Sequence, residues 1–230
     1  MWSELKPVDH ERLLDIMKLH SAIHRGHDLF RSGDSLRSLY VLRSGSVKTW
    51  NVTEDGEDHI IRFYWPGDVL GLGAISSGLY DCNATALETC SLCELPYHRF
   101  QKLAERIPAL NHQLLKLMSR EIALEEQRVL LRANRSALAR LATFLNCLSH
   151  NFSDRGFSSC EFNLTMGRQE IANYLGLALE TVSRTLSHFQ HQGVLSVDGK
   201  RICVTDKKRL AELGGLHNQG EALSARLSCH

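Results

Sequence analysis

Residues 165–193 read TMGRQEIANYLGLALETVSRTLSHFQHQG, and this stretch predicts two helices joined by a tight turn. Ala172 is small where the two helices must cross closely. Gly176, four residues later, supplies the positive φ that such a turn needs. The apolar side chains expected to pack the two helices together are those of Ile171, Leu175, Val182 and Leu186. The spacing is typical of a helix-turn-helix.

The residues that follow the second helix make this interpretation more specific. Gly193 ends the helix, and residues 194–205 predict a hairpin that turns at Asp198-Gly199. The plainer alternative is an ordinary helical hairpin. A helix pair followed by an Asp-Gly hairpin is much more specific than helix pairing alone, so we interpret this region as a winged helix-turn-helix that binds double-stranded DNA.

The second helix carries side chains with the chemistry needed to read bases. Glu180, Ser183 and Arg184 fall on its outer face near the N-terminal end, which is the end that enters a major groove. An arginine can donate two hydrogen bonds to N7 and O6 of guanine, and a glutamate can accept one from N4 of cytosine. The residues expected to contact DNA phosphates are Thr165, Arg168, Thr181, Lys200 and Arg201.

The net charge gives little support to nonspecific DNA binding. Residues 151–215 contain eight Lys and Arg against seven Asp and Glu, and the whole chain carries a formal charge of +1. Bulk electrostatic attraction to DNA is therefore weak, and affinity would depend on where individual cations lie.

A long helical stretch precedes this region. Between Pro108 and Gly156 there is no glycine or proline, and we expect a second helix from about residue 135 to 150. Within the first helix the spacing of three and four residues predicts a coiled-coil seam with one acidic member. A symmetric homodimer is the default partner, and packing on its own domain is the alternative. The seam consists of Leu115, Met118, Ile122, Glu125 and Val129.

The first hundred residues have a different sequence pattern. A short helix is expected over residues 5–20, and from about residue 22 short strands alternate with glycine-bearing turns as far as Pro96. Asp55-Gly56 is a hairpin signal between two of these strands. Strands and turns at this spacing predict a β-sandwich or barrel.

Composition excludes several classes of protein. The chain has 230 residues, of which 43% are hydrophobic and 23% charged, as expected for a globular protein. No apolar run is long enough to span a membrane, and the N-terminus lacks the layout of a signal peptide. Seven scattered cysteines, an odd number, favour a reducing cytoplasm over a disulfide framework.

Several motifs resemble the Fnr branch of the Crp/Fnr transcription regulators, and the resemblance extends over nearly the whole chain. The resemblance implies an α+β fold with an N-terminal β-roll, which is a jelly roll like that of cyclic-nucleotide-binding domains. We therefore expect a β-roll sensor over residues 1–107, a dimerisation helix over 108–134 and a C-terminal winged helix-turn-helix over 135–230. The matching motifs are Ser38–Gly45, Gly67–Gly71, Ala86–Thr89, Arg155–Ser158, Asn173–Leu177 and Glu180–Arg184.

The same resemblance implies a function for particular residues. Glu180, Ser183 and Arg184 match the three residues that read a TTGAT half-site in Fnr-type proteins. It also implies a homodimer, and RNA polymerase as a partner. The acidic turn expected to lie in the polymerase-facing region comprises Asp55, Glu57 and Asp58; otherwise it is simply a solvated hairpin.

Two departures from the family pattern concern its ligands. Leu72 follows Gly71 where cyclic-AMP-binding members have a glutamate, and Tyr80–Asn83 stands where they have an arginine, so we expect no cyclic AMP binding. Cys93 matches the internal ligand of the [4Fe–4S] cluster, but no cysteine precedes Cys82. Such clusters usually need four thiolates, so we expect none in this chain unless an N-terminal segment is missing. Cys93 remains a candidate sensor thiol, and the cofactor and the signal (redox state, oxygen or nitric oxide) are unidentified.

The competing class is an enzyme or small-molecule-binding module built on the roll. Twelve histidines are compatible with a cupin-like metal enzyme, but His24, His27 and His59 lack the close H-x-H spacing of such a site. Cys90 and Cys93 form a C-x-x-C pair, yet residues three apart on a strand face opposite sides of the sheet. We therefore predict neither a metal site nor a catalytic centre.

Overall fold

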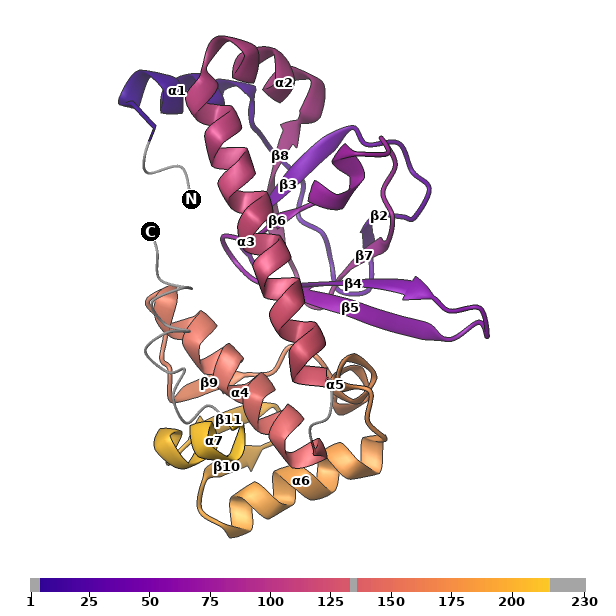
Figure 1. Cartoon of the computed structure of the whole chain (residues 1–230), viewed down its shortest axis with the longest axis vertical. Helices are drawn as coiled ribbons and strands as arrows, with labels where there is room; N and C mark the ends of the chain where they lie inside the picture. The colour runs from indigo at the N-terminus through magenta and orange to yellow at the C-terminus, as the bar shows by residue number, and fades with distance from the viewer. Residues whose placement is uncertain (1–4, 133–135, 216–230) are drawn as a thin grey trace. The chain divides into compact units, whose positions relative to one another are not determined.

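The computed structural model describes residues 5–132 and 136–215, without the side chains of residues 124, 126–132 and 154. The chain forms two compact units, residues 1–125 and 126–230 (Figure 1). Residues 216–230, whose sequence has little pattern, lie outside the described residues. No helix in the described part is long and apolar enough to cross a bilayer.

The first unit contains two four-stranded antiparallel sheets. One has the strand order β1-β8-β3-β6 and the other the order β2-β7-β4-β5. This is the β-roll expected from the family resemblance. The strands are β1 (Lys18–Leu19), β2 (Asp28–Phe30), β3 (Ser38–Ser44), β4 (Val47–Val52), β5 (Asp58–Tyr64), β6 (Val69–Leu70), β7 (Asn83–Ala86) and β8 (Ser91–Pro96).

Strand β3 shows how the roll is packed. Because side chains alternate along a strand, Tyr40 and Leu42 point into the core shared by both sheets, while Leu39 points to the opposite face of its own sheet. On that opposite face Leu39 packs with residues of α1 (Pro7–Ile16), α2 (Tyr97–Arg106) and the start of α3 (Pro108–Arg132). The short 3₁₀ helix η1 (Leu72–Ile75) follows β6.

The hairpin between β4 and β5 confirms the turn predicted from Asp55-Gly56. Val52 pairs with Asp58, and Gly56 has φ +80°, a conformation that side chains other than glycine rarely adopt. The β region ends at Pro96, also as predicted.

The second unit contains four helices and a small sheet within the described residues. The helices are α4 (Ala137–Asp154), α5 (Arg168–Leu175), α6 (Leu179–His191) and α7 (Lys207–Leu213). The sheet has the order β10-β11-β9 and consists of β9 (Glu161–Asn163), β10 (Leu195–Asp198) and β11 (Arg201–Val204). Helix α4 starts at Ala137, after its N-cap residue Ser136. It ends at Asp154, four residues later than the end at residue 150 predicted from the sequence.

One turn differs from its predicted position. The hairpin between β10 and β11 turns at Gly199-Lys200 and not at Asp198-Gly199, because Asp198 is still paired with Arg201. Gly199 has φ +57° and therefore takes the first turn position.

Candidate nucleic-acid interface

Helices α5 and α6 meet through the apolar residues that the sequence singles out. Ile171, Val182 and Leu186 are buried, and Ala172 is 1% exposed. Gly176 ends α5 with φ +63° and ψ +46°, as a tight turn into α6 requires. The predicted helix-turn-helix is thus confirmed in both its packing and its turn.

A side chain that sequence reasoning missed supports this turn. Arg140, on α4, donates a hydrogen bond from Nη1 to the carbonyl oxygen of Leu175 at 3.2 Å. Carbonyls at a helix C-terminus have no partner within the helix, so a cation there is favourable. Arg140 therefore ties α4 to the turn between α5 and α6.

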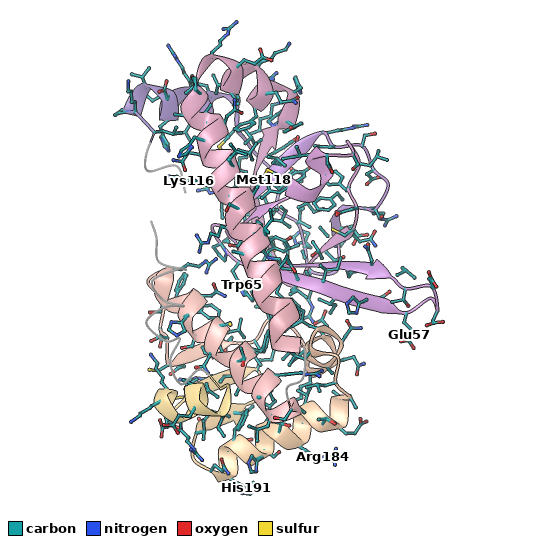
Figure 2. The ribbon with its side chains drawn as sticks, in the orientation of Figure 1. Glu57, Trp65, Lys116, Met118, Arg184 and His191 are labelled. Carbon is teal, nitrogen blue, oxygen red and sulfur yellow. The ribbon has the colours of Figure 1, made fainter. Side chains whose placement is uncertain are left out.

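The three predicted base-reading residues lie close together on α6. Glu180 and Arg184 are exposed and Ser183 is half-buried. Arg184 donates from Nη2 to Oγ1 of Thr181 at 3.4 Å, so its guanidinium lies beside the first turn of the helix. In Figure 2 Arg184 projects from α6 away from the rest of its unit.

Arg168 connects the two helices at this surface. It lies at the start of α5, and its Nη1 donates to Oγ of Ser183 on α6 at 3.4 Å. The structure thus brings a predicted phosphate contact, Arg168, next to a predicted base contact, Ser183. Together with Glu180 and Arg184 they form what we call the α6 surface.

The wing residues are placed differently. Lys200 is exposed at the tip of the β10–β11 hairpin. Arg201 is exposed but is ion-paired with Glu161 of β9, with Nη2 2.7 Å and Nε 2.9 Å from Oε1. Contact with a phosphate would have to compete with this carboxylate. Thr165 is half-buried just before α5.

Helix α6 begins without a side-chain cap. Its N-cap residue is Ala178, which has extended dihedrals but whose methyl side chain cannot accept a hydrogen bond from the first turn. Helix α5 is different, because Glu170 accepts a bond from the backbone N–H of its N-cap Gly167 at 2.8 Å. The N–H of Thr181 donates to the carbonyl oxygen of Ala178 at 3.0 Å, which leaves the N–H groups of Leu179 and Glu180 to solvent or to an external acceptor.

The predicted seam on α3 exposes large apolar side chains. Leu115 is 64% and Ile122 60% exposed, Met118 is half-buried and Glu125 is exposed. Figure 2 shows Met118 on this helix. The side chain of Val129 lies outside the described residues. Exposed leucine and isoleucine on one helix favour a partner helix over packing on the same chain, and the dimer stays a prediction.

A carboxylate lies in the part of the roll where the sequence departs from the cyclic-AMP-binding pattern. Helix η1 follows Gly71, and a Cβ added at Gly73 would lie 2.9 Å from Oδ2 of Asp81. The Asp81 carboxylate therefore packs against η1, in the region where family members that bind cyclic AMP place cationic and hydrogen-bonding groups for its phosphate. A negative group there would repel the phosphate.

The described cysteines do not fit a four-iron cluster. Cys90 is buried and contacts the carbonyl oxygen of Ser46 at 3.2 Å, while Cys93 is half-buried in β8 opposite Val41. Among residues with described positions, no three His, Cys, Asp or Glu side chains are grouped to hold a metal ion.

The comparisons with known proteins agree with these observations. Residues 21–107 match the cyclic nucleotide-binding domain and residues 139–213 the Crp-like helix-turn-helix domain. The chain is 43% identical to the transcriptional activator protein anr of Pseudomonas aeruginosa over 212 residues, which cover 92% of this chain and 87% of that protein. It is also 43% identical to the fumarate and nitrate reduction regulatory protein of Escherichia coli over 205 residues, covering 89% and 82%.

A solved structure shows the same architecture. FixK2 from Bradyrhizobium japonicum superposes with a TM-score of 0.77 and 27% identity, covering 86% of this chain and 97% of that one. A β-roll joined through a long helix to a winged helix-turn-helix defines a DNA-binding regulator with a sensor domain. The chain belongs to the Crp/Fnr family of transcription regulators.

Proposed function

We propose that this protein is a homodimeric, cytoplasmic regulator that reads a TTGAT-N4-ATCAA-like palindrome through α6. The observation that carries the proposal is the α6 surface, where Glu180, Ser183 and Arg184 lie together at the N-terminal half of one exposed helix face. A guanidinium and a carboxylate at this position supply the hydrogen bonds that distinguish G·C base pairs.

The remaining cationic and hydroxyl groups would fix the protein on the DNA backbone. Arg168 and Lys200 are exposed. Thr165, just before α5, and Thr181, in the first turn of α6, are half-buried. Arg201 would contribute only after leaving Glu161. Such contacts set the register of the protein on DNA without reading sequence.

A palindrome needs two copies of α6 related by a two-fold axis, so the proposal includes dimerisation. The exposed side chains Leu115 and Ile122, with Met118, Glu125 and Val129, would supply the interface. In this arrangement residues 1–107 are the sensor, 108–134 the dimerisation helix and 135–230 the DNA-binding domain.

The sensor would control DNA binding through a signal that is not cyclic AMP, with Cys93 as the candidate thiol. The relative from P. aeruginosa is named a transcriptional activator, which favours activation through RNA polymerase. The exposed Asp55, Glu57 and Asp58 of the β4–β5 hairpin would face the polymerase.

Fluorescence anisotropy with a labelled TTGAT-N4-ATCAA duplex tests the proposal. We expect specific binding, and we expect Arg184→Ala to weaken it by about 1–3 kcal/mol and to relax the preference at one base pair of each half-site. Lys208→Ala, which removes an exposed cation from α7, is the matched control and should leave base preference unchanged. Equal affinity for the palindrome and a scrambled duplex would disprove the proposal.

A further inference from the structure

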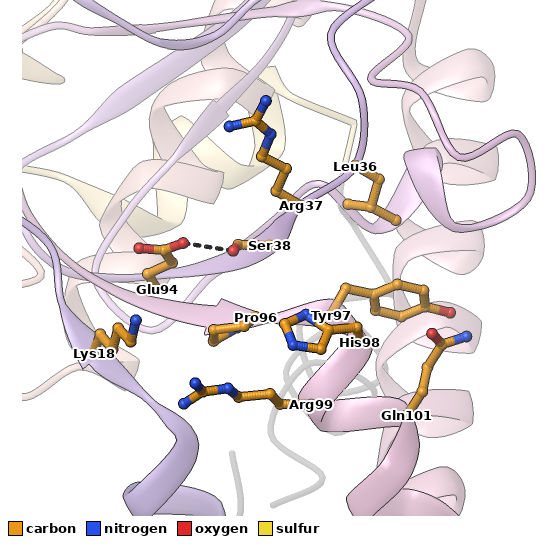
Figure 3. A pocket seen from close by; sticks show the side chains of 10 residues that line it. All are labelled: Lys18, Leu36, Arg37, Ser38, Glu94, Pro96, Tyr97, His98, Arg99 and Gln101. Carbon is orange, nitrogen blue, oxygen red and sulfur yellow. Dashed lines mark hydrogen bonds between the residues drawn. The ribbon is translucent and has the colours of Figure 1, made fainter.

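The sensor unit has a cavity that neither the α6 surface nor the dimer seam uses. It lies where β8 ends and α2 begins, and its volume is about 490 Å³. We call it the α2 pocket. Figure 3 shows the side chains that line it, from Lys18 on β1 through Glu94 on β8 to Arg99 on α2. Pairing of Lys18 with Glu94 across β1 and β8 brings the N-terminal strand to this cavity.

The lining is strongly cationic. Lys18, Arg37 and Arg99 contribute three positive charges, against one carboxylate from Glu94. That carboxylate already accepts a hydrogen bond from the Ser38 hydroxyl at 2.6 Å. Among the described residues none of the three cations takes part in an ion pair. All three cations are exposed to solvent, so they can turn toward an anion that enters the pocket.

The N-terminus of α2 adds to this positive field. Its N-cap is Pro96, which provides no side-chain cap, and its first turn contains no acidic residue. His98 and Arg99 stand there instead. Helix N-termini carry a partial positive charge and favour acidic residues, so the Arg99 cation is unfavourable for the helix unless an anion lies beside it. The N–H of Tyr97 donates to the carbonyl oxygen of Arg37 at 2.9 Å, so an anion at this helix end would be held mainly by the cationic side chains.

We propose that the α2 pocket binds a small organic anion with two ionised acidic groups, of the dicarboxylate or phosphate-ester kind. Three cations against one carboxylate leave a local charge of +2, which matches such a ligand. The volume falls within the range of small-molecule sites and exceeds what a single inorganic anion fills. This inference rests on the roll alone and is independent of which DNA sequence α6 reads.

Titration calorimetry of the full chain at low salt tests the site, with citrate representing carboxylates and pyrophosphate representing phosphates. We expect saturable binding of at least one probe. The probe that binds more tightly shows whether the pocket prefers carboxylate or phosphate groups. Lys18→Gln and Arg99→Gln should each weaken binding by about tenfold or more, since each removes a charge-assisted hydrogen bond. Arg43→Gln, an exposed cation of β3 outside the pocket, is the control and should change nothing.

Three outcomes would overturn the proposal. One is that neither probe shows saturable binding up to about 10 mM, which would mean a binding free energy smaller than about 3 kcal/mol. Another is loss of binding in Arg184→Ala together with full binding in Arg99→Gln, which would place the anion on the α6 surface. The last is binding of a hexaglutamate peptide through Lys18 and Arg99 while citrate and pyrophosphate fail, which would indicate a docking surface for an acidic protein segment. Thermal unfolding of each variant establishes that it is folded.

Discussion

The guanidinium of Arg62, on β5, is ion-paired with the carboxylate of Glu121, on α3. The Arg62 side chain is 6% exposed and that of Glu121 29%. Arg62 also lies over the ring of Tyr64, with Cζ 4.4 Å from the ring centroid, and its Nε has no hydrogen-bond partner among the described residues. A buried charge with one hydrogen-bonding group unsatisfied depends strongly on its single anionic partner. The pair therefore ties the roll to the helix that carries the dimer seam.

Removing the two partners should have unequal effects. Glu121→Ala leaves the buried Arg62 uncompensated and should cost about 3 kcal/mol of the free energy of unfolding. Arg62→Met should cost less, because the remaining carboxylate is part-exposed and water can solvate it, and because methionine keeps the packing. Urea unfolding measures both, with Glu105→Ala on α2 as a control for an exposed glutamate.

The double variant completes the cycle. Once Glu121 is gone, Arg62→Met removes an unpaired buried charge, so the double variant should be more stable than Glu121→Ala alone. If the two single effects simply add, the ion pair contributes nothing and α3 is held by apolar contacts only.

A cap is missing at the start of α6 and can be added. Ala178 has φ −73° and ψ 148°, the dihedrals of an N-cap residue, so Ala178→Ser needs no change of backbone. We expect it to stabilise the DNA-binding unit by about 1 kcal/mol, seen as a higher melting temperature. The converse variant is Ser136→Ala, because Ser136 caps α4 by accepting a bond from the N–H of Ala139 at 3.2 Å; it should lower the melting temperature. An unchanged or lower melting temperature for Ala178→Ser would mean that its hydroxyl does not reach the first turn.

Local patterns in the sequence predicted the local structure well. The apolar spacing around Gly176 fixed which faces of α5 and α6 are buried, and the Asp55-Gly56 signal placed the β4–β5 hairpin. The wing turn lies one residue later than predicted. The Asp of an Asp-Gly pair can be either the first turn residue or the last paired strand residue, and the pairing of Asp198 with Arg201 shows that it is the latter here. Periodicity and turn chemistry are properties of neighbouring residues, so one sequence suffices for them.

Contacts between distant segments could not be predicted in this way. Arg62 stands out as a charge in the apolar run Ile60–Phe63, which signals a buried partner, but nothing in the run points to Glu121. The α2 pocket arises only when β1 pairs with β8 and brings Lys18 to Glu94. Such groupings depend on strand order, which periodicity does not encode.

The thiols should differ in reactivity. Burial, with the Asp81 carboxylate beside it, raises the pKa of Cys82 to about 12, and burial also raises the pKa of Cys90. A shift from 9.0 to about 12 lowers the thiolate fraction at neutral pH by roughly a thousandfold. Because the thiolate is the reactive form, iodoacetamide should label the exposed Cys160 well before Cys82, and Cys82 labelling should keep rising above pH 9.

Mass spectrometry of the peptides measures this order, and Cys160→Ser removes the fast site as a control. Labelling of Cys82 at the rate of Cys160 at neutral pH would show that the Cys82 site opens to solvent. Comparison of the Cys93 rate in air and under nitrogen then tests its candidate role as a sensor thiol.

Glu125 is the acidic member of the predicted seam and is exposed on α3. In a symmetric dimer it would lie near its own copy. Two carboxylates at such a position repel each other, and burying either one costs desolvation energy. The family resemblance implies that an acidic residue at this position keeps the dimer weak until the signal arrives. We therefore expect Glu125→Ala to tighten dimerisation by about 1 kcal/mol, close to fivefold in Kd, and to raise DNA binding without a signal.

Sedimentation equilibrium at several protein concentrations measures the dimer, and anisotropy with the palindromic duplex measures DNA binding. Glu11→Ala, an exposed glutamate on α1, controls for the change in net charge, because it also removes one negative charge but lies outside the seam. At higher salt the difference between Glu125→Ala and the parent should shrink, since screening weakens repulsion between exposed charges. A weaker mutant dimer would mean that a cation of the partner helix pairs with Glu125, so that the carboxylate supports assembly and does not restrain it.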